Sequence, residues 1–229
     1  MSRRQHSSFS RFAQIVVSLV CLALPALAGP AVTINSDANS VYNSGTGPYV
    51  LGWQFSITAP LQVTSLGFWD YLGDGFRAPN GNPSEDVGIW DTAQTPNLLV
   101  SISVSSTDPL TNVLADGSGF RFASLGSVLT LQPGTYIIGG TNHNTESYLS
   151  WPEGHVSYDP AVTWIYGMYA YSDGLTVPNI AGGGTPAGWF GANFETGAPE
   201  PGTITFLLLG SGLLALLARR ARSRSRIPD

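Results

Sequence analysis

Hydrophobic and polar residues alternate along much of the middle of this chain of 229 residues. Between residues 51 and 57 every second side chain is apolar, and these side chains are Leu51, Trp53, Phe55 and Ile57. Residues 98–104 show a similar alternation, with serines between the apolar positions. A period of two is typical of a β-strand with one buried face. The pattern therefore predicts strands at both places.

Further strands are expected at residues 61–69, 86–90, 120–122, 163–171 and 188–194. Residues 128–140 read as two strands joined by a turn at Gln132-Pro133-Gly134-Thr135, with a positive φ at Gly134. No long stretch with a helical period lies between the two ends of the chain. Eight to ten short strands joined by turns predict an all-β chain, folded as an antiparallel β-sandwich of jelly-roll type.

The first residues interrupt this pattern with an apolar run behind arginines, as a secretory signal peptide does. We expect the export machinery to translocate the chain and signal peptidase to cut it after Ala28. The features that indicate this are Arg3, Arg4 and Arg11, the apolar run 13–24, and the small residues Ala26 and Ala28.

A second uncharged run, from Thr203 to Ala218, predicts one C-terminal transmembrane helix. As a helix, this run is about 24 Å long, against about 30 Å of hydrocarbon in a bilayer. Arginines follow it, and Arg219, Arg220 and Arg222 are expected to anchor this end in the cytoplasm. Since the N-terminal arginines favour the same side, the residues between the two apolar runs are predicted to lie across the membrane.

Charge and cysteine usage narrow the range of partners and chemistry. Residues 29–201 contain fourteen acidic residues against two arginines, a formal charge of −12. This balance excludes nucleic acid as a partner, because phosphate binding needs a basic surface. Cys21 is the only cysteine and lies in the predicted signal peptide, so no internal disulfide, thiol catalysis or cysteine metal site is expected in the mature chain.

In front of the apolar run, Pro199, Glu200 and Pro201 favour an extended backbone that a protease can read. Motif, apolar run and arginines together resemble the PEP-CTERM sorting domain. The resemblance implies recognition by exosortase, a membrane-embedded cysteine protease, removal of the anchor near the motif, and delivery to the cell surface or the exopolysaccharide matrix. The alternative is a membrane anchor that is never cut. The chain is thus divided into a signal peptide at 1–28, an ectodomain at 29–197 and a sorting segment at 198–226.

The ectodomain also resembles a known domain. GWQFSITAPLQVTSLGFWDYLGDGF, VGIWD, FRFASL and LTLQPGTYIIGG, all between residues 52 and 140, are similar to an ectodomain that recurs in PEP-CTERM proteins. This resemblance implies a β-sandwich without an assigned activity.

Candidate chemistry is sparse, and no catalytic site is expected. His143 and His155 are predicted loop residues, and Glu146 with Glu153 is the least implausible pair of catalytic carboxylates. No cofactor is expected. The alternative is a calcium ion bound between residues 70 and 86, because carboxylates supply the hard oxygen ligands that calcium prefers. The candidate ligands are Asp70, Asp74, Glu85 and Asp86. A solvated acidic loop is the simpler interpretation of the same residues.

Aromatic side chains offer a second candidate site, since sugar rings stack on flat aromatic faces. Trp53, Trp69 and Trp90 are expected in the core. Trp164 and Tyr166 are placed on one face of their strand and Tyr169 with Tyr171 on the other, unless a bulge intervenes. The candidates for glycan contact are Trp151, Tyr169, Tyr171 and Trp189.

These observations favour an exported, surface-sorted β-sandwich with a structural or adhesive role in an exopolysaccharide matrix. Its expected partners are exosortase, the export machinery, signal peptidase, the membrane before processing, and exopolysaccharide. A carbohydrate-binding module is the alternative, and a secreted hydrolase is the third hypothesis.

Overall fold

The computed structural model describes residues 29–35, 41–42, 48–76, 84–142, 148–149, 156–182 and 190–197. These residues form strands and turns, with one short 3-10 helix, η1 (Tyr71–Gly73). Residues 28–197 form one compact unit. The predicted signal peptide, sorting motif and membrane span lie outside the described residues, and with them Ala26, Ala28, Pro199, Glu200, Pro201, Arg219, Arg220 and Arg222.

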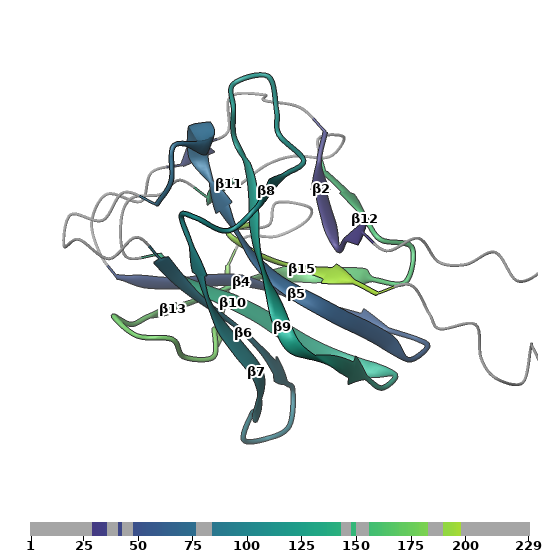
Figure 1. The fold of residues 1–229 in the computed structure, drawn as a ribbon. Coiled ribbons are helices and arrows are strands. Elements are labelled where there is room, and N and C mark those ends of the chain that lie inside the picture. The colour runs from purple at the N-terminus through teal and green to yellow at the C-terminus, as the bar shows by residue number, and fades with distance from the viewer. Residues whose placement is uncertain are drawn as a thin grey trace, which may run out of the picture. The chain divides into compact units, whose positions relative to one another are not determined.

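Two antiparallel sheets form a sandwich, as the sequence predicts (Figure 1). The five-stranded sheet has the order β1 (Gly29–Pro30), β15 (Ala192–Thr196), β5 (Leu61–Asp70), β9 (Gly119–Leu131), β8 (Leu110–Thr111). The six-stranded sheet has the order β14 (Ile180–Gly182), β13 (Thr163–Tyr171), β4 (Tyr49–Ile57), β10 (Gly134–Asn142), β6 (Ser84–Asp91), β7 (Leu98–Ser105). Two small ladders join β2 (Val32–Ile34) to β12 (Val156–Tyr158) and β3 (Val41–Tyr42) to β11 (Tyr148–Leu149).

The central strands are nested in the manner of a jelly roll. β4 pairs with β10, β5 pairs with β9, and β6 pairs with β7, so the chain from β4 to β10 is one long hairpin wrapped into two layers. β13 and β15 then add to the other sides of β4 and β5. The jelly-roll-like architecture follows from this nesting.

The predicted turn near Pro133 connects two layers instead of closing a hairpin. Leu131 pairs with Leu61 in the five-stranded sheet, whereas Gly134 pairs with Ile57 in the six-stranded sheet. Gly134 is already part of β10, and it is not among the glycines with a positive φ. The predicted positive φ was wrong because a connection that crosses between sheets does not need the reversal of a tight hairpin turn.

Aromatic side chains fill the space between the sheets. Trp53 of β4 stacks on Phe194 of β15, with ring centroids 5.9 Å apart and planes 15° from parallel. The indole Nε1 of Trp53 donates a hydrogen bond of 2.8 Å to the carbonyl oxygen of Ala192, so one side chain links the two layers. Phe55 lies 5.1 Å from the Phe194 ring. The largely buried strand β15 is therefore held from the opposite sheet.

All three tryptophans predicted to be buried are buried. Trp53 and Trp69 belong to the main core cluster. Trp90 follows the core residue Ile89 and points to the opposite face of the six-stranded sheet, where it lies beside Gly88 and near Leu175. The β13–β14 connection covers part of that face, because a Cβ atom on Gly139 would lie 2.5 Å from Pro178.

The two ends of the described chain are tied to each other. Gly29 pairs with Thr196, and the amide of Ala31 donates to the carbonyl oxygen of Phe194 at 2.7 Å. Asn193 is fully buried and binds Val32 twice, since its Oδ1 accepts from the Val32 amide at 3.1 Å and its Nδ2 donates to the Val32 carbonyl at 2.8 Å. The amide side chain of Asn193 thereby makes the two hydrogen bonds that the backbone of a neighbouring strand would make with Val32.

We predict that Asn193→Ala lowers the free energy of unfolding of the mature protein by about 3 kcal/mol, because a buried N–H and a buried C=O lose their partner. Asn97→Ala is the matched control: its amide binds Asp91 at an exposed turn, and a loss below about 1 kcal/mol is expected. Urea unfolding followed by tryptophan fluorescence measures both values, and equal losses would show that the Asn193 contact is unimportant.

Candidate functional site

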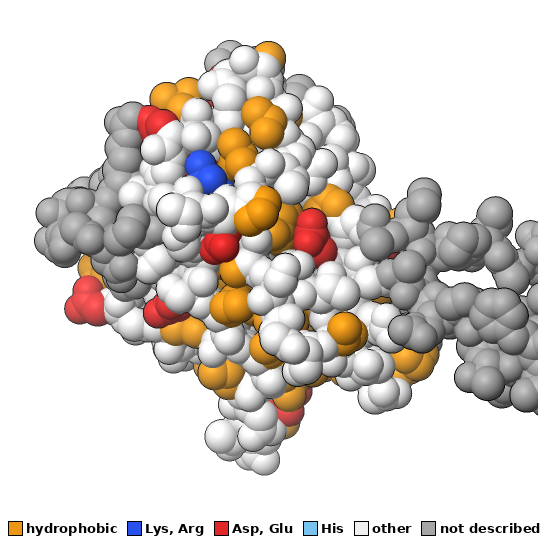
Figure 2. Space-filling model, in the orientation of Figure 1, with side chains coloured by type: hydrophobic (Ala, Val, Ile, Leu, Met, Phe, Trp, Pro, Cys, Tyr) orange, Lys and Arg blue, Asp and Glu red, His pale blue; other side chains and the backbone are white. Residues whose placement is uncertain are grey.

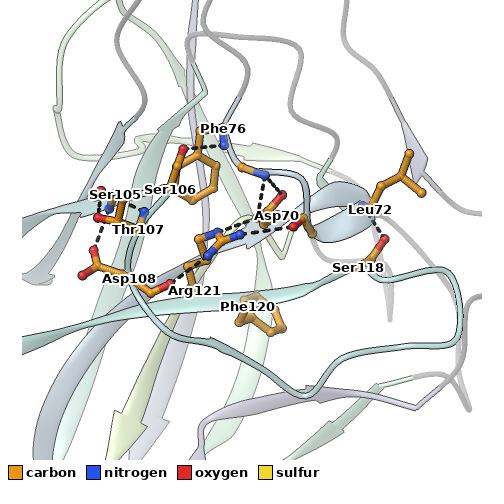
Figure 3. Close-up of polar contacts among 12 residues, drawn as sticks. Asp70, Leu72, Phe76, Ser105, Ser106, Thr107, Asp108, Ser118, Phe120 and Arg121 are labelled. Atoms are coloured by element: carbon orange, nitrogen blue, oxygen red, sulfur yellow. Dashed lines mark hydrogen bonds and ion pairs between the residues drawn. The ribbon is translucent and has the colours of Figure 1, made fainter.

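A buried ion pair lies at one end of the sandwich (Figure 3). Arg121 of β9 is the only basic residue other than histidine among those the structure describes. Its Nε donates to the Oδ2 of the fully buried Asp70 at 2.5 Å, and its side chain is 12% exposed. The other guanidinium nitrogens donate to the carbonyl oxygens of Asp108 at 2.8 Å and Gly73 at 3.2 Å. One cation on β9 therefore binds two other segments of the chain, the end of β5 with η1 and the β7–β8 connection.

The loop after β5 folds around the same carboxylate. The amide of Gly75 donates to both oxygens of Asp70, at 3.2 and 3.1 Å. Ser118 accepts from the amide of Leu72, whose φ of 62° is in the left-handed region, and Ser106 accepts from the amide of Phe76. These contacts make the cluster a fastening between β5, β9 and the β7–β8 connection (Figure 3). None of the groups in these hydrogen bonds is a reactive group that faces the solvent.

Two of the four carboxylates predicted as calcium ligands have hydrogen-bond partners inside the protein. Asp70 is engaged by Arg121, and Glu85 is fully buried and accepts from the hydroxyl of Thr141 at 2.6 Å. The interpretation as a solvated acidic loop was wrong for these two residues, because both side chains are buried. In the described part of the chain, no three His, Cys, Asp or Glu side chains form a group that could hold a metal ion.

A cluster of three tyrosines occupies the paired ends of β4 and β13. Tyr171 pairs with Tyr49, and their ring centroids lie 5.1 Å apart. Tyr169 lies 5.5 Å from Tyr171 with its ring nearly perpendicular. Tyr171 is 68% exposed, which is the largest exposure among the large hydrophobic and aromatic side chains described. We call these residues the tyrosine cluster.

Tyr169 interacts with both other members of the tyrosine cluster. Burial raises the pKa of Tyr169 above its usual range, and a hydrogen bond with Tyr171 and the nearby charges of Tyr171 and Tyr49 raise it further. Neutral phenols both donate and accept hydrogen bonds. The cluster thus combines flat rings with hydroxyl groups, which suits contact with sugar hydroxyls and ring faces.

A β-bulge changes the predicted distribution of aromatic residues along β13. The register shifts between Trp164, which pairs with Phe55, and Tyr166, which pairs with Gln54. Since neighbouring β4 residues point to opposite faces, Trp164 shares a face with Tyr169 and Tyr171, and Tyr166 lies on the other. The predicted grouping of Trp164 with Tyr166 holds only for an unbulged strand.

Sequence reasoning identified part of this cluster and missed part. Tyr169 and Tyr171 were predicted glycan contacts, and the structure brings them together. Tyr49 was missed; its only signal is its place at the start of an alternating strand. The predicted contacts Trp151 and Trp189, the histidines His143 and His155, and the carboxylates Glu146 and Glu153 lie outside the described residues.

The described surface is sparsely charged. On the face shown in Figure 2, red acidic side chains are scattered and blue appears in one small area. Many carboxylates stabilise turns: Asp91 binds Asn97, Asp116 binds Ser118, and Asp159 binds Ala161. The acidic residues are thus used locally rather than gathered into one site.

Comparison with known proteins adds one finding. Residues 198–223 match the family model of the PEP-CTERM protein-sorting motif. The motif marks the chain as an exosortase-sorted extracellular protein, which is exported and anchored in the membrane before processing. No curated protein matches the sequence. Among the described residues no helix is long and apolar enough to cross a membrane, and the predicted span at 203–218 lies outside them.

We predict that Arg121→Met lowers the free energy of unfolding by about 3–5 kcal/mol, because Asp70 is left as a buried charge without its cationic partner. The double variant Asp70→Asn/Arg121→Met removes that charge and is expected to recover part of the loss. Denaturant unfolding of the wild type, the two single variants Arg121→Met and Asp70→Asn, and the double variant tests this. A double variant as unstable as the sum of the two single changes would contradict the coupling.

Proposed function

We propose that this chain, which carries the PEP-CTERM protein-sorting motif, is a structural or adhesive component of an exopolysaccharide matrix, released at the cell surface by exosortase. The observation that supports this most directly is the position of the folded unit in the chain. Gly197, whose amide binds the carbonyl oxygen of Gln62, is the last residue before the matched segment. Every described strand lies before that segment, so cleavage within it removes none of the described strands.

The N-terminal end fits the same scheme. β1 begins at Gly29, the residue that follows the predicted signal peptide cut. The hydroxyl of Thr196 donates to the carbonyl oxygen of Gly29 at 3.1 Å and to Asp159 at 2.9 Å. Because the two ends of the domain are hydrogen-bonded to each other, they are expected to stay bound after both flanking segments are removed. Such a domain suits a matrix, where proteases attack loose termini.

A non-catalytic role is supported by how the polar groups are used. Asp70 holds Arg121, and the carboxylates of Asp91, Asp116 and Asp159 bind the backbone or side chains of their own turns. Polar groups that stabilise the fold in this way are already committed to hydrogen bonds. We therefore propose that the ectodomain acts as a stable binding domain and does not catalyse a reaction.

Glycan binding is the second candidate function, and the tyrosine cluster favours it. Tyr171 offers an exposed ring, with Tyr49 and Tyr169 packed beside it. An aromatic contact supported from behind by other rings loses little conformational freedom when it binds. We propose the exopolysaccharide as the ligand, with Trp151 and Trp189 as further contacts.

The sorting proposal predicts that Glu200→Ala blocks removal of the C-terminal segment. Mass spectrometry of surface-released wild-type protein is expected to show a C-terminus that lacks residues 203–229, whereas the variant stays in the membrane fraction at full length. Glu195→Ala is the matched control, because this glutamate precedes the motif in β15. Release of the Glu200 variant with the wild-type C-terminus would overturn the proposal.

The adhesive role predicts that the released protein sediments with the exopolysaccharide fraction. Recovery of the protein mainly as free monomer in the medium would contradict it.

Glycan binding predicts that Tyr171→Ala weakens retention of the released protein on purified exopolysaccharide about tenfold, through loss of a stacking contact. Tyr166→Ala removes a tyrosine from the other face of the same strand and is expected to leave retention unchanged. Affinity electrophoresis in gels that contain the polysaccharide measures both. Equal effects of the two changes would exclude the tyrosine cluster as the binding surface.

A further inference from the structure

The sheet edges differ sharply from one another. Among the described residues the outer strands of the two main sheets are β1, β8, β14 and β7. β1 and β8 have two residues each, β14 has three, and β1 contains Pro30. β7 has eight residues, LLVSISVS, with neither a charge nor a proline. Short edge strands, prolines and charges protect an edge from pairing with other chains, and β7 alone lacks all of them.

The strands beside the short edges are protected in another way. β9 and β13 extend beyond β8 and β14, and both have an irregular register. In β9 the shift lies between Ser124 and Leu129, and in β13 it lies between Trp164 and Tyr166. A bulge disrupts the line of backbone groups that a new strand would need. β7 has one register shift, between Leu98 and Val100 at its start, and from Val100 to Ser105 its register against β6 is continuous.

β7 is also held firmly at both ends. Before it, the Asp91 carboxylate accepts from the backbone amide and the side-chain amide of Asn97, both at 2.8 Å. At its other end, the amide of its last residue, Ser105, donates to Asp108 at 2.7 Å, and the carbonyl oxygen of Asp108 accepts from Arg121. The strand therefore presents its backbone as a fixed template, at the margin of the sheet in Figure 1.

The side chains of β7 favour self-pairing. Leu98 is 49% exposed and Leu99 is 38% exposed, although the alternation predicts one buried face. In an antiparallel pair of two β7 strands centred on Ser101, Val100 lies opposite Ile102 of the second copy, and Ser101 lies opposite its own counterpart. Apolar residues then meet apolar residues on one face.

The distribution of charge also favours a second copy of this chain as the partner of β7. Two copies of the chain, each with a formal charge of −12 over residues 29–201, repel one another, and the repulsion is weakest where they meet along an uncharged strip such as β7. We propose that β7 pairs with β7 of a second copy of this chain about a two-fold axis, and so joins the two six-stranded sheets into one continuous sheet. This interface goes beyond the proposed function and depends neither on sorting nor on glycan binding.

The pairing leaves the tyrosine cluster accessible. The cluster lies on β13 and β4, and three strands separate β13 from β7 in the sheet order. A dimer formed through β7 carries two such clusters, at the far sides of the joined sheet. If the clusters bind polysaccharide, two sites on one particle link neighbouring chains and raise the overall affinity.

A single engineered cysteine tests the interface. In the full-length chain with Cys21→Ser, Ser101→Cys places one thiol at the predicted two-fold axis. Directly opposite residues of an antiparallel pair have Cα atoms about 4.5–5.5 Å apart, within the range of a disulfide. Mild oxidation of cells is expected to give a disulfide-linked dimer on a non-reducing gel.

Ser127→Cys is the matched control, because Ser127 is also an exposed serine and lies in the interrupted part of β9. It is expected to stay monomeric. Dimers are scored for both the full-length and the shortened chain, so failure of C-terminal processing is seen separately from failure of pairing. Cross-linking of Ser101→Cys no faster than that of Ser127→Cys would overturn the proposal.

A charge substitution gives an independent readout. Ser101→Lys sets two like charges directly opposite each other and is expected to raise the dissociation constant of the dimer about fivefold, measured by sedimentation velocity. Ser127→Lys is expected to leave the constant unchanged. Equal dissociation constants for Ser101→Lys and the wild type would show that the copies associate through another surface or not at all.

Discussion

The contact between Trp53 and β15 holds the two layers of this sandwich together. Trp53 stacks on Phe194 and donates to the carbonyl oxygen of Ala192 at 2.8 Å, while Asn193 on the same strand binds the backbone of Val32. β15 lies between β1 and β5. The last described strand thus completes a sheet whose other members come from the beginning and the middle of the chain.

This closure fits an exported chain. Val32 and Asn193 are 161 residues apart in sequence, so their contact forms only after nearly the whole ectodomain is available. Contacts between distant residues slow folding, because the loop between them must first be ordered. A fold that only its last strand completes suits an exported chain. The same strand precedes the segment that matches the sorting motif.

Several features of the fold serve to present surfaces. The Asp70–Arg121 pair joins β5 and β9, and it also fixes the residues that follow β7 through the Asp108 carbonyl. At the other side of the six-stranded sheet, pairing of β4 with β13 brings Tyr49 to Tyr171. One sheet therefore offers a backbone edge at one margin and an aromatic surface near the other. Two surfaces of this kind on a single domain suit a protein that acts by linking other molecules.

The sequence by itself determined the fold class, the central strands and the sorting motif, because a period of two and a linear motif depend on neighbouring residues. It predicted Tyr169 and Tyr171 but could not place Tyr49 beside them, since that contact depends on the register between β4 and β13. The bulge at Trp164, the layer change at Pro133 and the burial of Asp70 against Arg121 were decided by tertiary structure alone. Each of these features depends on a contact with a strand or charge that is distant in sequence, and local sequence patterns do not reveal such contacts.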